Sequence, residues 1–167
     1  SGVDLDQVVR GQVIAHPDTF RQTRRIDVTF KLLPSSSLPL EHNTEVKFFI
    51  GAAERIARVR LIGTDQRKPG EEGWLQLEMV EPVVAARGDR YILRRPSPGE
   101  TLGGGVVLDP TPKYRHKRFS DEVLARLKAL AQGSPEEVLM QALITLKAAP
   151  FGEVEKAANL DAEVLQQ

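Results

Sequence analysis

The chain has 167 residues, 41% of them hydrophobic, and its 23 basic and 23 acidic residues give a formal net charge of zero. This length allows a real hydrophobic core, and the balanced charge neither indicates nor excludes a nucleic-acid partner, because a binding patch needs only local charge. The absence of cysteine excludes disulfides and thiolate metal sites, and without an apolar run of roughly 20 residues or a signal-peptide pattern we expect a cytoplasmic protein with no membrane partner.

The chain opens at Ser1-Gly2 without a methionine. Residues 1–17 are typical of the end of a preceding domain rather than of a natural start. We therefore expect a fragment of a longer protein.

From about residue 24 to residue 109, apolar and polar side chains alternate. The expected inward positions are Val28, Phe30, Leu32, Val46, Phe48, Ile50, Ala57, Val59, Leu61, Leu75, Leu77 and Met79. Alternation indicates strands with one buried and one wet face, as in antiparallel sheets. Turn signals at 34–39, 51, 63, 69–70 and 88–89 separate these strands. About six strands predict a small closed barrel, which leaves no exposed edge.

Residues 110–118 form a basic segment whose two prolines make its start stiff and non-helical. Its cations are Lys113, Arg115, Lys117 and Arg118, and none of its residues is acidic. These side chains could neutralise RNA phosphates while Tyr114 stacks on a base. The alternative is a solvated linker that keeps two domains apart, as charge runs usually do. Both interpretations stay open.

From residue 119 the apolar period becomes helical. One stripe consists of Val123, Leu124, Leu127, Leu130 and Ala131. Residues 134–137 form a capped start for a second helix, which a Pro-Phe-Gly sequence at 150–152 ends. Short helices are expected at 153–158 and from residue 161. This order predicts the opening of a helix-turn-helix or winged-helix domain, truncated at Gln167.

The sequence carries no recognisable catalytic constellation. We find no paired carboxylates, no Ser/His/Asp set and no Gly-x-x-x-x-Gly-Lys-[Ser/Thr] phosphate loop. The three histidines, His16, His42 and His116, are too scattered in sequence to indicate a zinc site. We therefore expect no catalytic, cofactor-binding or metal-binding residues here and no enzyme activity of these residues by themselves.

The block Gly88-Asp89-Arg90-Tyr91-Ile92-Leu93-Arg94, followed by Thr101-Leu102-Gly103-Gly104-Gly105-Val106-Val107-Leu108-Asp109-Pro110, is the most informative part of the chain. It resembles the closing strands of the third domain of elongation factor Tu-type translational GTPases. In detail it is most similar to the selenocysteine-specific elongation factor (SelB) family. The phrases at 10–14, 45–54, 69–70 and 76–78 extend this resemblance over nearly the whole chain.

The resemblance implies a domain organisation. Residues 1–17 would be the tail end of a preceding domain II barrel, and 18–110 a six-stranded antiparallel β-barrel of elongation factor Tu domain III type. Residues 111–118 would be a basic linker and 119–167 the start of a winged-helix domain. The expected fold is thus mainly β, with an α-helical C-terminal part.

The resemblance also implies a function for the longer protein. SelB-type factors bind GTP and selenocysteinyl-tRNA through their first three domains and deliver the tRNA to the ribosome at recoded UGA codons. Their C-terminal winged helices bind an mRNA hairpin. GTP and magnesium would belong to a GTPase domain that these residues do not include.

By this resemblance, Thr101 and Gly103 are the leading candidates for tRNA contact. Gly104, Arg94 and His42 are further candidates. On physical grounds alone, the glycine run either lets a tRNA backbone approach or marks a bend in a barrel strand. Gly105 fits the structural role better.

Two alternatives remain on the sequence. The chain could come from another elongation factor Tu-like GTPase that delivers a different tRNA, although the helical extension argues against this. It could also be a winged-helix DNA-binding regulator with a β-barrel domain. Residues 161–167, the candidate recognition helix, contain no Arg or Lys, which disfavours that alternative.

Overall fold

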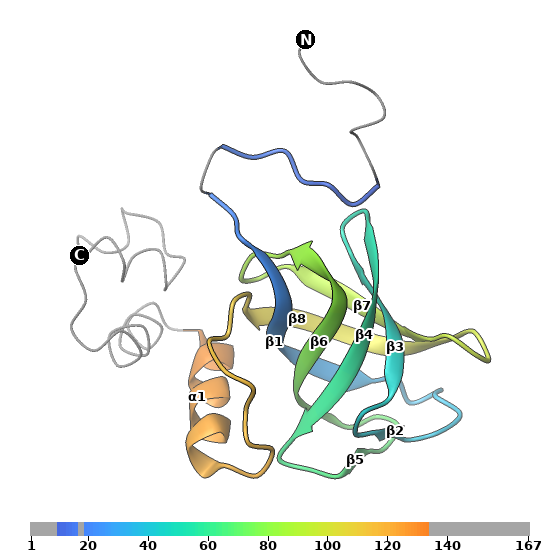
Figure 1. Cartoon of the computed structure of the whole chain (residues 1–167). Coiled ribbons are helices and arrows are strands. Elements are labelled where there is room, and N and C mark those ends of the chain that lie inside the picture. The colour runs from blue at the N-terminus through green and yellow to red at the C-terminus, as the bar shows by residue number, and fades with distance from the viewer. Residues whose placement is uncertain (1–9, 17–18, 134–167) are drawn as a thin grey trace. The chain divides into compact units, whose positions relative to one another are not determined.

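Strands occupy most of residues 22–109 in the computed structural model, which describes residues 10–16 and 19–133 (Figure 1). They are β1 (Gln22–Leu32), β2 (Leu40–Glu41), β3 (Glu45–Ile50), β4 (Ala53–Ile62), β5 (Gln66–Arg67), β6 (Glu72–Val84), β7 (Arg90–Arg95) and β8 (Glu100–Asp109). The chain divides into two compact units, Ser1–Phe119 and Ser120–Gln167. All eight of these strands belong to the first unit.

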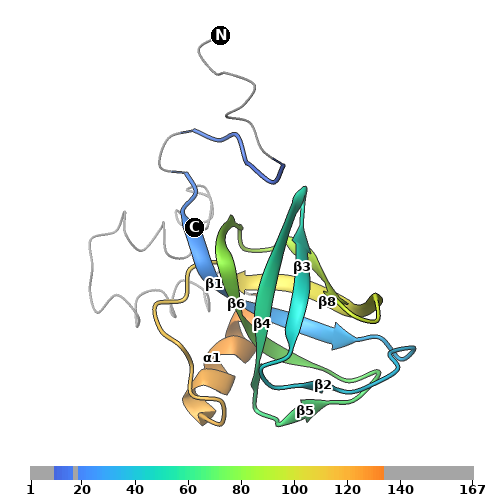
Figure 2. The same cartoon turned by 45° about the vertical axis from the view of Figure 1, so that its right-hand side comes forward.

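Six strands close into a barrel in the order β1-β6-β4-β3-β7-β8, and β8 pairs with β1. Every pair is antiparallel. The predicted six-stranded antiparallel barrel is therefore confirmed. The short strands β2 and β5 pair separately as a ribbon at one end of the barrel (Figure 2). The sequence did not predict this ribbon, because two-residue strands carry no alternation.

The barrel interior is filled by the alternate apolar residues of its strands. All twelve predicted inward positions are buried, with Phe30 and Phe48 among the largest. The ring of Phe48 lies 5.5 Å, centroid to centroid, from that of Tyr91 on β7. Burial of this set is the main source of stability, at about 25 cal/mol for each Å² of apolar surface removed from water.

The predicted turns at Gly51 and Gly88 are also present. Both residues have positive φ angles, 51° and 87°, which a residue with a Cβ atom adopts only with strain. They allow β3 to reverse into β4 and the chain to reverse before β7. Gly88 N–H also donates to the Val107 carbonyl, at 2.9 Å.

Two polar residues break the expected pattern. Asp27 on β1 and Gln76 on β6 alternate with inward apolar neighbours, so their side chains point out of the barrel. Both are nevertheless fully buried. A segment of chain must therefore cover the outer wall here, and it is the segment that follows β8.

The described part of the second unit contains one helix, α1 (Asp121–Gln132). Ser120 caps its start by accepting a hydrogen bond from Val123 N–H, and Gly133 ends it with φ of 71°. Leu127 and Leu130 of the predicted stripe are buried, whereas Ala131 is exposed. The helices predicted beyond residue 133, and with them most of the predicted winged-helix segment 119–167, lie outside the described residues.

Candidate nucleic-acid interface

The outer face of β7 and the start of β8 bring two of the predicted tRNA contacts together. Arg94 pairs with Thr101 across the two strands, and both side chains are exposed. Arg95 points to the opposite face, as period-two geometry requires, and its side chain is only 14% exposed. Of the two adjacent arginines, only Arg94 is thus freely available to an RNA phosphate.

A small polar network fixes the loop beside this face. The Glu100 carboxylate accepts hydrogen bonds from Ser37 N–H at 2.6 Å and from Ser37 Oγ at 3.0 Å. Its Oε2 also accepts a longer bond from Arg95 Nε, at 3.4 Å. The Ser37 main-chain bond is the largest of the effects that lower the pKa of Glu100. The network ties the 34–39 loop to the first residue of β8.

The three glycines of β8 occupy positions with no room for a side chain. A Cβ atom on any of them would collide with a main-chain oxygen of a neighbouring strand. These oxygens belong to Lys31 for Gly103, Tyr91 for Gly104 and Thr29 for Gly105. Strand β8 is therefore held closely between β1 and β7, which is sufficient reason for the run. Packing alone thus explains the three glycines. The tRNA contact of Gly103 and Gly104 stays a prediction.

The Tyr91 side chain reaches from β7 past the glycines of β8 to β1. It is opposite Gly105 on β8, and its hydroxyl donates to the Thr29 carbonyl on β1, at 2.6 Å. The side chain is buried, and burial raises the pKa of Tyr91 well above its ordinary value. This hydrogen bond joins the two strands that flank β8.

The segment 110–119, hereafter the strap, lies against the outer barrel wall and follows β8 in Figure 1. Its centre is His116, whose Nε2 lies 2.6 Å from Asp27 Oδ2. Gln76 on β6 bonds both to β1 and to the strap. Its Nε2 donates to Asp27 Oδ1 and to the Tyr114 carbonyl, and its Oε1 accepts from His116 N–H. These contacts account for the burial of Asp27 and Gln76.

Arg118 fastens the far end of the strap. Its guanidinium donates to the carbonyls of Leu61 and Thr64, at 3.3 and 2.8 Å, and its Nη2 lies 2.8 Å from Asp65 Oδ1. In return, the Arg118 carbonyl accepts from Gly63 N–H at 2.7 Å. Arg118, a predicted RNA contact, is thus engaged by the turn that follows β4.

The other four predicted RNA contacts of this segment are exposed: Lys113, Tyr114, Arg115 and Lys117. Arg115 forms an ion pair with Glu78 on β6, at 3.0 Å, yet its side chain remains 53% exposed. The strap therefore directs some of its basic side chains into the wall and others to solvent.

His42, the remaining predicted tRNA contact, lies apart from the others. It is half-buried between β2 and β3. Burial lowers the pKa of His42, and so do the nearby charges of Arg118, Arg60 and Arg115. These neighbours belong to the strap and β4, so His42 does not share a face with Arg94 and Thr101 on β7 and β8.

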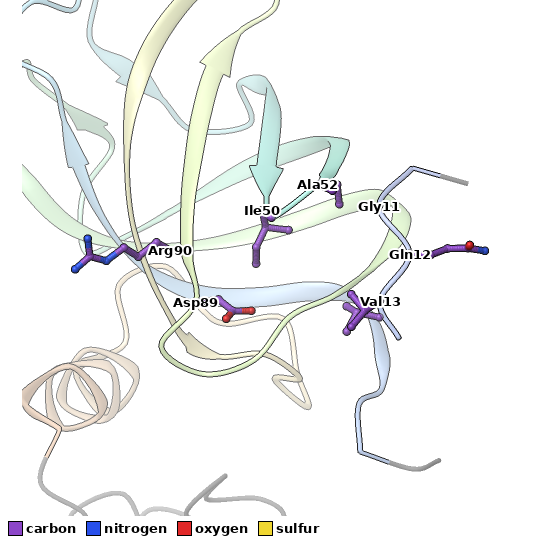
Figure 3. Close-up of a pocket in the computed structure, with 10 residues that line it drawn as sticks. Gly11, Gln12, Val13, Ile50, Ala52, Asp89 and Arg90 are labelled. Carbon is purple, nitrogen blue, oxygen red and sulfur yellow. The ribbon is translucent and has the colours of Figure 1, made fainter. Parts of the chain in front are cut away.

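A shallow hollow of about 170 Å³ lies where residues 11–13 approach the turn between β3 and β4 (Figure 3). Gly11 packs directly against Ala53, and Arg10 Nε donates to the Ala52 carbonyl at 3.2 Å. Asp89 in its lining accepts from Ala86 N–H, which stabilises a turn. Arg90 points away from the hollow in Figure 3. The arrangement is that of a packing contact rather than of a ligand site.

Within residues 10–16 and 19–133, no three His, Asp or Glu side chains are grouped in a way that could hold a metal ion. In the same part of the chain, no helix is both long and apolar enough to cross a membrane.

The comparisons with known proteins agree with this geometry. Residues 24–114, more than half of the chain, match the family described as the selenocysteine-specific elongation factor, beta-barrel domain. This chain belongs to the SelB family. A selenocysteine-specific elongation factor from Desulfomicrobium baculatum is 33% identical over 142 residues, which cover 85% of this chain and 22% of the relative. The chain thus spans about a fifth of that relative's length.

Proposed function

We propose that this SelB barrel binds selenocysteinyl-tRNA through the exposed face of β7 and the start of β8. The full protein would be a GTP-dependent translation factor, active in the cytoplasm, that delivers this tRNA to the ribosome at recoded UGA codons. The family match carries the proposal, because the matched range includes the paired and exposed Arg94 and Thr101.

The proposed contacts have different roles. Arg94 supplies positive charge to a phosphate of a tRNA stem, and Thr101 offers a hydroxyl donor beside it. Gly103 and Gly104 add no side chain that would hold the RNA away. This part of the protein performs no chemistry and binds neither GTP nor magnesium, which belong to the GTPase domain of the parent protein. It connects the tRNA to winged helices that bind the mRNA hairpin.

The test is filter binding of selenocysteine tRNA by the full-length factor carrying Thr101→Glu. A carboxylate at position 101 would oppose a nearby phosphate and neutralise Arg94, so we expect affinity to fall about tenfold, which corresponds to ~1.4 kcal/mol. Gln66→Glu, an exposed change of the same charge on β5, is the control and should bind as the wild type does. If the two variants bind the tRNA with equal affinity, β8 is not part of the tRNA interface.

Competition tests the specificity of the same site. Labelled selenocysteine tRNA is bound to the full-length factor and then competed with unlabelled tRNA. Unlabelled selenocysteine tRNA should displace it at lower concentration than a bulk elongator tRNA does. If an elongator tRNA competes equally well, the chain fits an elongation factor Tu-like protein that delivers a different tRNA.

A further inference from the structure

Three basic side chains of the strap, referred to as the row, are exposed: Lys113, Arg115 and Lys117. By contrast, His116 and Arg118 point into the barrel wall. The segment is not a regular strand, because residues 113 and 114 are bends and 118–119 form a turn. The three cations nevertheless fall within five consecutive residues, so one strand of nucleic acid can reach all of them.

The barrel wall beside this row is also basic. Arg60 on β4 donates to the His116 carbonyl at 2.8 Å, and no carboxylate within the described residues is within ion-pair distance of it. After burial, the charge of Arg115 is the largest cause that lowers the pKa of Arg60. Glu78 contacts two guanidinium groups, Arg115 at 3.0 Å and Arg25 at 3.5 Å. Asp27 contacts His116 and Asp65 contacts Arg118. Even with these two carboxylates and Glu78, the cations of the strap and of the wall beside it are in excess, so the local charge is positive.

Two exposed aromatic rings belong to the same segment as these cations. Tyr114 is 66% exposed and Phe119 is 59% exposed. A cation already lies by each ring: Lys113 Nζ is 5.5 Å from the Tyr114 centroid, and Arg118 Cζ is 4.9 Å from the Phe119 centroid. Cations that follow a backbone, together with aromatic rings that stack on bases, are the features that bind single-stranded nucleic acid. In a duplex the bases already stack on each other, so the rings would add little.

We infer that the strap, with the wall beside it, is a binding track for unpaired RNA. Lys113, Arg115 and Lys117 contact phosphates, and Tyr114 and Phe119 stack on bases. The track lies over β1, β4 and β6, whereas the proposed tRNA contacts lie on β7 and β8. It therefore does not depend on the proposed tRNA role, and either one can fail alone.

The experiment is fluorescence anisotropy with the 167-residue chain and a fluorescein-labelled oligouridylate, compared with an RNA duplex of the same length. Each single-strand phosphate contact contributes about 0.7 to the slope of log affinity against log salt concentration. The double variant Arg115→Gln/Lys117→Gln should therefore lower that slope by about 1.4. The control Lys31→Gln/Lys68→Gln removes the same charge from exposed sites outside the strap and should leave the slope unchanged.

A second variant separates stacking from charge. Tyr114→Ala should weaken binding of the oligouridylate by about five- to fiftyfold and leave duplex binding nearly unchanged. The ring is exposed, so the thermal unfolding midpoint should match that of the wild type, which shows that the strap is still in place. The inference is overturned if the strap double variant has the slope of its control. It is also overturned if Tyr114→Ala leaves the affinity for unpaired RNA unchanged or weakens both RNAs equally.

Discussion

His116 Nε2 lies 2.6 Å from Asp27 Oδ2, and this contact joins residues 89 positions apart in the chain. It fixes the strap to the first barrel strand, in a place where the aspartate is fully buried. Gln76 adds hydrogen bonds to both sides of the contact. The strap is therefore part of the barrel's folded structure, and the basic side chains that it presents have a defined orientation.

Replacing His116 tests this attachment. His116→Ala would remove a partner from the buried Asp27 carboxylate, and we expect the free energy of unfolding to fall by about 2–3 kcal/mol. Urea denaturation followed by fluorescence of the tryptophan, Trp74, measures it. Lys117→Ala, one residue away and exposed, should change stability by no more than ~0.5 kcal/mol. A His116 variant as stable as the Lys117 variant would show that the contact adds nothing.

Arg118 provides a local prediction. Arg118→Ala removes the donors to Leu61 and Thr64 and should loosen the end of the strap. The Gly63 amide, which donates to the Arg118 carbonyl, should then exchange with deuterium about tenfold faster or more. Arg118→Lys should not restore protection, because an ammonium group cannot reproduce the planar fork. If the Gly63 amide exchanges at the wild-type rate in both variants, Arg118 does not hold the end of the strap in place.

The β8 glycines differ from the exposed glycines of the barrel unit. Gly105→Ala would place a methyl group against the Thr29 carbonyl and should cost about 1–3 kcal/mol of stability, measured by urea denaturation. Gly99→Ala is the matched control, because no atom lies within 4 Å of the added Cβ. If Gly105→Ala and Gly99→Ala are equally stable, the close approach of β8 to β1 is not a structural requirement.

Burial of the Tyr91 phenol should make the free energy of unfolding fall at alkaline pH. Because burial raises the pKa of Tyr91, the neutral phenol is favoured in the folded state, and its contribution is fully present below the ordinary pKa of about 10. That contribution is lost as pH rises above this value. Tyr91→Phe should cost about 1 kcal/mol at neutral pH, through loss of the bond to Thr29. Its deficit relative to wild type should shrink between about pH 9 and pH 11, measured by urea denaturation. A constant deficit would contradict the prediction.

The alternation of residues such as Val28 and Leu77 was enough to predict the antiparallel barrel, because a strand's period directly determines which side chains are buried. Applied to their neighbours, the same rule would put Asp27 and Gln76 on the wet face, whereas the structure buries both. Their burial depends on a segment far away in sequence, so no local pattern could show it. Likewise, the glycine run was visible in the sequence, but the carbonyl oxygens that require it belong to other strands.

The candidate sites divide in the same way. The pairing of Arg94 with Thr101 follows from a hairpin and was within reach of sequence reasoning. The separation of His42 from them was not, because it depends on how the barrel closes. The inward direction of Arg118 and the outward direction of Arg115 also became visible only once the strap was seen against the wall.

The central proposal is that this barrel contacts tRNA through β7 and β8, and one binding series tests it most directly. The affinity of the 167-residue chain for selenocysteine tRNA is measured over a range of salt concentrations for the wild type, Arg94→Gln and Lys31→Gln. We predict that Arg94→Gln lowers the slope of log affinity against log salt by about 0.9, as expected for one lost phosphate contact in a helical stem, while Lys31→Gln does not. Identical slopes for all three proteins would contradict the proposal.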